Sequence, residues 1–235
     1  MTDFIFVHGA MMGGWVWDET IAAIKEKSGE ARCIALDVPG CGSKRGRDVR
    51  ELSFDGLIHG LLDDVDASGL TDAVLIGHSQ GGTVLPRLAE ARPGLFRKLV
   101  YIACVGPNPG QSVMDASDSD GDGQDVKATT IMEGLRTMLC NDMDVAMTRD
   151  FLAKLGGGDA WPPASYIFNG WRYDHLEHVP SAYIYCERDN CVPPARQDAY
   201  LANLHIDSVI RLDCGHQPMN SRPEELADIL LAEAG

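Results

Sequence analysis

The strongest constraint on the fold of this chain is a serine held between two glycines at the end of an apolar run. Residues 73–76 read AVLI, which has the length and β-branched content of a buried strand, and residues 77–81 read GHSQG. After Gly82 the apolar residues recur with helical periodicity. A Gly-x-Ser-x-Gly pattern between a strand and a helix predicts a sharp turn that exposes the Ser79 hydroxyl as a nucleophile. The flanking glycines make room for neighbouring chain in such a turn.

A helix beginning at Ser79 would add a second chemical feature. Its N-terminal end carries partial positive charge, which favours the oxyanion that forms during acyl transfer. The alternative is a turn with a purely structural role. The strand before the serine and the helix after it disfavour that alternative.

Strand-length apolar runs alternate with helical periodicity along the whole chain. The predicted strands are 4–7, 33–36, 73–76, 99–103, 181–186 and 208–212, and the predicted helices are 15–27, 53–65, 82–92, 194–204 and 222–232. Ser53 is the predicted N-cap of the second helix. The alternation predicts an α/β fold with a mostly parallel sheet flanked by helices, and the length of 235 residues favours one domain, 1–235.

The longest interruption of this alternation follows the strand that ends near Ala103. We expect the segment from about 106 to 178 to form a small cap. Its aromatic residues suggest the roof of an apolar pocket, and Trp161 and Trp171 are the candidates for substrate contact. For any one of them, simple packing of the cap onto the body is the competing interpretation.

An acidic stretch, residues 115–125, reads DASDSDGDGQD and is predicted to be a solvated loop. Four of its residues match positions of a calcium-binding loop, namely Asp118, Asp120, Asp122 and Gly123. However, Thr129 stands where the bidentate glutamate belongs. We therefore predict no metal site.

His8, Gly9 and Ala10 directly follow the first predicted strand. If that strand neighbours the one before Ser79, the Ala10 N–H can form an oxyanion hole with the N–H of Gln80. Gly9 would let this backbone approach the substrate. The further candidates for substrate contact here are Met11 and His78. The competing interpretation is that the segment merely ends a strand.

Ser79, Asp189 and His216 each lie in a loop directly after a predicted strand. The carboxyl ends of parallel strands meet at one edge of a sheet, so these three residues can converge. We assign Ser79 as nucleophile, His216 as general base and then general acid, and Asp189 as the residue that orients the imidazole. Glu187 and Asp213 are rivals for the acid, and the competing histidines are His8, His59, His78, His175, His178 and His205.

Composition limits the partners of the chain. The formal net charge of −15 argues against binding nucleic acid or an anionic membrane. Seven cysteines, an odd number without a C-x-x-C pair, favour free thiols in a cytoplasmic protein. There is no signal peptide pattern and no apolar segment of membrane-spanning length. A homodimer is compatible with the sequence.

Four pieces of the sequence resemble the α/β-hydrolase fold family: His8-Gly9-Ala10, Gly77 to Gly81, Asp189 and Gly215-His216. More narrowly, HGAMMGGWVW and GHQPMNSRPEEL resemble the plant methylesterase and hydroxynitrile lyase branch and its bacterial esterase relatives. Lyases of that branch carry a threonine at the position of Gly9 and a lysine after the catalytic histidine, where this chain has Gln217. The resemblance therefore implies ester hydrolysis and disfavours the lyase reaction.

Together these features predict a serine hydrolase that cleaves a small, neutral carboxylic ester or lactone through an acyl-enzyme on Ser79, without a cofactor. Hydrolysis of a C–C bond, an amide or a thioester by the same three residues is an alternative, because the acyl intermediate is shared. A second alternative is a non-catalytic ligand receptor on the same fold. Such a receptor would bind its ligand without consuming it.

Overall fold

One parallel sheet organises the protein, whose computed structural model describes residues 2–118 and 130–235. The strands are β1 (Asp3–Val7), β2 (Arg32–Leu36), β3 (Ala73–His78), β4 (Phe96–Ile102), β5 (Ser181–Cys186) and β6 (Ser208–Leu212). Their order is β2-β1-β3-β4-β5-β6, and every adjacent pair is parallel. The predicted parallel α/β sheet is confirmed.

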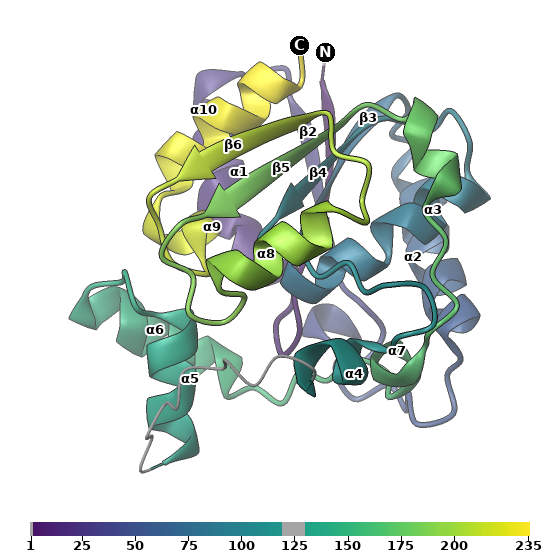
Figure 1. Ribbon diagram of the computed structural model, residues 1–235. Helices are drawn as coiled ribbons and strands as arrows, with labels where there is room; N and C mark the ends of the chain where they lie inside the picture. Colours follow the sequence, from purple (N-terminus) through teal and green to yellow (C-terminus); the bar gives the residue numbers. More distant parts are fainter. Residues whose placement is uncertain (1, 119–129) are drawn as a thin grey trace.

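Helices cover both faces of the sheet (Figure 1). The α-helices outside the cap are α1 (Asp18–Lys27), α2 (Phe54–Ser68), α3 (Leu85–Ala91), α8 (Pro194–Leu201), α9 (Pro218–Ser221) and α10 (Pro223–Glu233). Short 3-10 segments are η1 (Gly14–Trp17), η2 (Gly42–Lys44) and η3 (Ser79–Thr83). α1 and α10 lie on one face, and α2 and α3 lie on the other.

The strands bury both faces because their side chains alternate between two apolar clusters. Phe4 and Phe6 of β1 join the cluster under α1 and α10. Ile5 and Val7 join the cluster under α2 and α3. All four are fully buried, so the register of this central strand is specified from both sides.

The segment between β4 and β5 has no strand among its described residues. It contains α4 (Val113–Asp118), α5 (Ile131–Leu139), α6 (Val145–Leu155), α7 (Ala164–Ile167) and the 3-10 segment η4 (Asp174–His178). In Figure 1, α4 and α7 lie close together, whereas α5 and α6 project to one side. These helices occupy the stretch in which the sequence predicts a cap.

The expectation of a loop throughout residues 115–125 is wrong at its start, because α4 extends to Asp118. Ser112 and Asp115 explain the helix. The Ser112 N–H donates to the Asp115 carboxylate (2.8 Å), and the Asp115 N–H donates to the Ser112 hydroxyl (3.0 Å). This reciprocal capping begins a helix at Val113. Asp120, Asp122, Gly123 and Thr129 lie outside the described residues.

The helix expected directly after the nucleophile also differs. Residues Ser79–Thr83 form the 3-10 segment η3, and α3 begins only at Leu85. Pro86 stands in the first turn of α3, where its missing N–H costs no helical hydrogen bond. The N-terminus of α3 is therefore set back from Ser79 by one 3-10 segment.

Ser53 caps α2 as predicted, since its side chain accepts a hydrogen bond from the Gly56 N–H at 3.1 Å. We expect Ser53→Ala to lower the free energy of unfolding by about 1 kcal/mol, because it leaves that N–H without its partner. Ser28→Ala is the matched control, because Ser28 lies at the C-terminal end of α1, where its main-chain N–H, which the substitution keeps, donates to the Ile24 carbonyl. Chemical denaturation measures both variants. Equal midpoints for Ser53→Ala and the wild type would contradict the cap.

Candidate active site

Ser79 lies at the end of β3 in a strained backbone conformation. Its φ angle is +52°, in the left-handed region that non-glycine residues rarely adopt. A Cβ atom at Gly77 would lie 2.7 Å from Leu85 Cδ1, and one at Gly81 would lie 2.8 Å from the Val7 carbonyl oxygen. Glycine is thus required at position 81, because the turn packs against the main chain at the end of β1. At Gly77 the close contact is with the movable end of the Leu85 side chain, and the Gly81 carbonyl oxygen lies 3.1 Å away.

Asp189 and His216 form a buried pair at the ends of β5 and β6. The His216 Nδ1 lies 2.7 Å from Asp189 Oδ2. The other carboxylate oxygen accepts the main-chain N–H groups of Cys191 (2.7 Å) and Val192 (2.8 Å). These bonds fix the orientation of the carboxylate and therefore that of the imidazole.

The two rival acids lie elsewhere. Asp213 is 76% exposed and pairs with Arg188 at 2.6 Å. Glu187 is also exposed and lies 3.7 Å from Arg211. The structure therefore brings Asp189, and neither rival, to His216.

Burial and charge act in opposite directions on His216. Burial disfavours the imidazolium, but the Asp189 carboxylate, together with the neighbouring Cys191, outweighs it and raises the pKa of His216 well above its usual value of 6.5. The pKa is thus higher in the folded than in the unfolded chain. Protonation of His216 therefore stabilises the fold at acidic pH, fully below about pH 6.5, and this contribution is lost as pH rises through the folded pKa.

His78, a predicted substrate contact, lies behind the serine and contacts His216 instead. Its Nε2 is 2.8 Å from the His216 carbonyl oxygen, so Nε2 carries the proton and donates. Burial, and then the neighbouring His216, lower the pKa of His78 well below its usual value. The neutral ring of His78 therefore holds the main chain of His216 beside the turn that carries Ser79.

A cavity of about 280 Å³ opens at Ser79. Ala10 and Gln80, the predicted oxyanion-hole residues, line it together with the serine. The remaining lining residues are Val105, Val113, Met114, Ser117, Tyr166, Cys191, Val192, Arg196 and Tyr200. Of these nine, the sequence analysis placed only Tyr166, one of the cap aromatic residues, at the roof of the pocket. Arg196 and Tyr200 lie four residues apart on α8, after the Asp189 loop. This spacing indicates that the two side chains share one side of the helix.

The other predicted contacts do not line this cavity. Gly9 packs against the serine turn, where an added Cβ would lie 2.9 Å from His78 Nδ1 and 3.0 Å from Ser79 Cβ. Met11 is 41% exposed and has a φ angle of +62°. Trp171 is buried against Phe54 and Phe168 and donates to the Gln111 carbonyl at 2.7 Å. Trp161 is buried as well, and its indole N–H donates to the Gly9 carbonyl at 3.0 Å.

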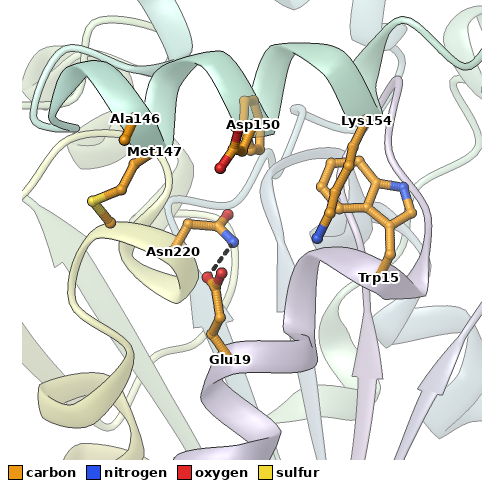
Figure 2. A pocket seen from close by; sticks show the side chains of 8 residues that line it. Trp15, Glu19, Ala146, Met147, Asp150, Lys154 and Asn220 are labelled. Carbon is orange, nitrogen blue, oxygen red and sulfur yellow. Dashed lines mark hydrogen bonds between the residues drawn. The ribbon is translucent and has the colours of Figure 1, made fainter.

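A second cavity, of about 170 Å³, lies where α6 rests on η1, α1 and α9. Figure 2 shows Asp150 and Lys154 extending from α6 toward Trp15, Glu19 and Asn220. The Asn220 amide donates to Glu19 at 2.9 Å, and the Lys154 ammonium lies 5.4 Å from the Trp15 ring centroid. Its described lining residues include no serine, cysteine or histidine, so the cavity at Ser79 is the better candidate for the active site.

Comparison with known proteins identifies the family. A profile of the alpha/beta hydrolase family matches residues 4–229, and the chain belongs to this family. It is 28% identical to a carbendazim hydrolyzing esterase from Nocardioides sp. (strain SG-4G), over 99% of each chain. It is 24% identical to methylesterase 1 of Arabidopsis thaliana, over 97% of this chain and 94% of that protein.

The structure is also similar to an extracellular alpha/beta-hydrolase from a Paenibacillus species. The TM-score is 0.78 at 19% identity, and the match covers 99% of both chains. The predicted fold, and the resemblance to plant methylesterases and bacterial esterases, are confirmed. Within the described residues, no helix combines the length and apolar character needed to cross a membrane.

The Asp189–His216 pair leads to a prediction about the pKa of His216. Asp189→Asn should lower the pKa of His216, because the carboxylate that stabilises the imidazolium is gone. An NMR titration of the His216 ring measures this shift. Asp213→Asn is the matched control and should leave the titration unchanged, since the Asp213 carboxylate is exposed and paired with Arg188. An unchanged His216 midpoint in Asp189→Asn would show that Asp189 does not control this charge.

Proposed function

We propose that this protein is a serine hydrolase that cleaves a small, neutral carboxylic ester or lactone through an acyl-enzyme on Ser79. One observation carries the proposal. The strained Ser79 opens into a cavity at the same sheet edge as a buried histidine whose orientation is fixed by a buried carboxylate. A nucleophile, a base and a group that orients the base are the parts that acyl transfer requires.

In the proposed mechanism, Ser79 Oγ attacks the ester carbonyl carbon as its proton passes to His216 Nε2. The negative charge that forms on the carbonyl oxygen is stabilised by the N–H groups of Ala10 and Gln80. The C–O bond to the alcohol breaks, and His216 returns the proton to the departing oxygen. Water then attacks the acyl-enzyme with His216 again as base, which releases the acid and restores Ser79. Asp189 stabilises the imidazolium in both steps.

The cavity and the relatives support an ester of modest size. Most residues that line the cavity are apolar, and its volume is about 280 Å³. The relatives named above include a carbendazim hydrolyzing esterase and a methylesterase. At the position after His216, where a lyase of this branch has lysine, Gln217 is fully buried and uncharged. Ester hydrolysis therefore fits this site better than release of cyanide.

Replacement of the nucleophile or of the base tests the proposal. With a short-chain p-nitrophenyl ester, Ser79→Ala and His216→Ala should each lose at least about a thousandfold in kcat, because each variant lacks a group that acts in the reaction. Ser28→Ala, which changes a serine far from the cavity, should keep the wild-type rate. Far-UV circular dichroism checks that all variants are folded.

A serine-directed phosphonate provides a measurement that does not depend on the choice of ester. Mass spectrometry should find the phosphonyl group on Ser79 in the wild type and no label in Ser79→Ala. Absence of both turnover and label in the folded wild type would contradict the esterase assignment. A ligand receptor that performs no chemistry would then be the leading account.

Matched substrates test the type of bond. An ester, a lactone, a thioester, an amide and a C–C cleavage substrate that share one acyl group should be compared by kcat/KM. We expect the neutral ester or the lactone to be cleaved fastest, because relatives that match nearly the whole chain are named as esterases. Faster cleavage of the amide or of the C–C bond would replace the ester assignment with that activity.

A further inference from the structure

The Gly9 carbonyl oxygen accepts two buried hydrogen bonds. The His8 Nδ1 lies 2.8 Å from it, and the Trp161 Nε1 donates to it at 3.0 Å. His8 Nε2 accepts the Val38 N–H at 3.1 Å, so the proton of the neutral ring is on Nδ1, which donates to Gly9. Burial lowers the pKa of His8, which keeps this ring neutral.

The same peptide group carries the N–H of Ala10. The structure has no cis peptide bond among the residues it describes, so the Gly9 carbonyl and the Ala10 N–H point in opposite directions from one rigid plane. Ala10 lines the Ser79 cavity, and within residues 2–118 and 130–235 its N–H has no hydrogen-bond acceptor. His8 and Trp161, which donate to the Gly9 carbonyl oxygen, therefore also fix the direction of the Ala10 N–H.

We propose that Trp161 and His8 are positioning residues that aim the Ala10 N–H at the developing oxyanion. This inference rests on the proposed function, and it gives Trp161 a task other than contact with substrate. Donation to the carbonyl also polarises the peptide group, which makes its N–H a stronger donor. A cap residue thereby takes part in transition-state stabilisation without touching the reacting atoms.

Charged and main-chain contacts hold Trp161 in place. The neighbouring Asp159 is buried, and its carboxylate accepts the Gly42 N–H at 2.7 Å and pairs with Arg45 at 2.8 Å. The Ala160 N–H donates to the Gly40 carbonyl at 3.3 Å. Asp159 and Ala160 are thus bound to the loop after β2, and the indole ring of Trp161 packs edge-on against His8.

Trp161→Phe tests the inference, because it removes the indole N–H and keeps an aromatic ring. We expect kcat for the p-nitrophenyl ester to fall about tenfold to a hundredfold, with KM changed less than about twofold, since the lost interaction acts on the transition state. Tyr173→Phe is the matched control. It removes a donor from another buried cap aromatic to a main-chain carbonyl, that of Pro107 (2.8 Å), and should keep the wild-type kcat.

A transition-state analogue distinguishes positioning from loss of structure. The affinity for a trifluoromethyl ketone, which forms a tetrahedral oxyanion on Ser79, should fall in Trp161→Phe by the same factor as kcat/KM. The infrared carbonyl band of the acyl-enzyme should also move to higher wavenumber, because the carbonyl oxygen accepts a weaker hydrogen bond. An unchanged kcat and an unchanged analogue affinity in folded Trp161→Phe would overturn the inference.

His8 supplies a second test should Trp161→Phe fail to fold. His8→Leu removes the other donor to the Gly9 carbonyl, whereas the amide nitrogen of His8→Asn can take the place of Nδ1. We expect His8→Asn to retain at least about tenfold more kcat than His8→Leu. Equal rates in the two variants would overturn the inference. Wild-type turnover and phosphonate labelling of Ser79 test the proposed function separately, so the two failures are distinguishable.

Discussion

The six strands that the structure describes run in the same direction, and the rest of the structure depends on this. The loops after β1, β3, β5 and β6 leave the sheet at one edge and carry Ala10, Ser79, Asp189 and His216. The core under both faces fixes where each strand ends. A shift of one residue in any of them would turn its last side chain to the opposite face. Packing far from the cavity therefore determines the geometry of the site.

Close backbone approach is the second requirement of the site. Ser79 adopts a positive φ angle, and the chain around it leaves no room for a Cβ at Gly9 or Gly81. The surrounding contacts hold this strained conformation. The His78 ring donates to the His216 carbonyl oxygen, and the end of β1 packs against the turn. Contacts from neighbouring strands and loops thus offset the backbone strain at Ser79.

Much of this arrangement could be predicted from the sequence, because strands and the serine turn have strong local patterns. The choice of Asp189 over Glu187 and Asp213 depended on which carboxylate turns inward, and only the three-dimensional path of the loop decides that. The start of α4 was missed although Ser112 and Asp115 have capping-box spacing. The acidic composition of residues 115–125 favours a loop and so competes with the capping-box spacing.

The hydrogen bond from Trp161 could not be predicted in this way. Its partner, the Gly9 carbonyl, is 152 residues away in the sequence, and a buried aromatic residue in a cap usually serves packing alone. For Arg196 and Tyr200, the spacing on α8 indicates only that they share one side of the helix, because their place in the cavity depends on how α8 lies against the segment between β4 and β5.

The attachment of Asp159 and Ala160 to the loop after β2, and of Trp161 to the loop after β1, has a consequence for protein engineering. Exchanging the segment between β4 and β5 for that of a relative would assume that this segment and the sheet are independent modules. Here the two are not independent, because Asp159 bonds to Gly42 and Arg45 and Trp161 bonds to the Gly9 carbonyl beside the Ser79 turn. A graft that replaces α4 and α7 but retains Asp159 to Trp161 would keep these contacts.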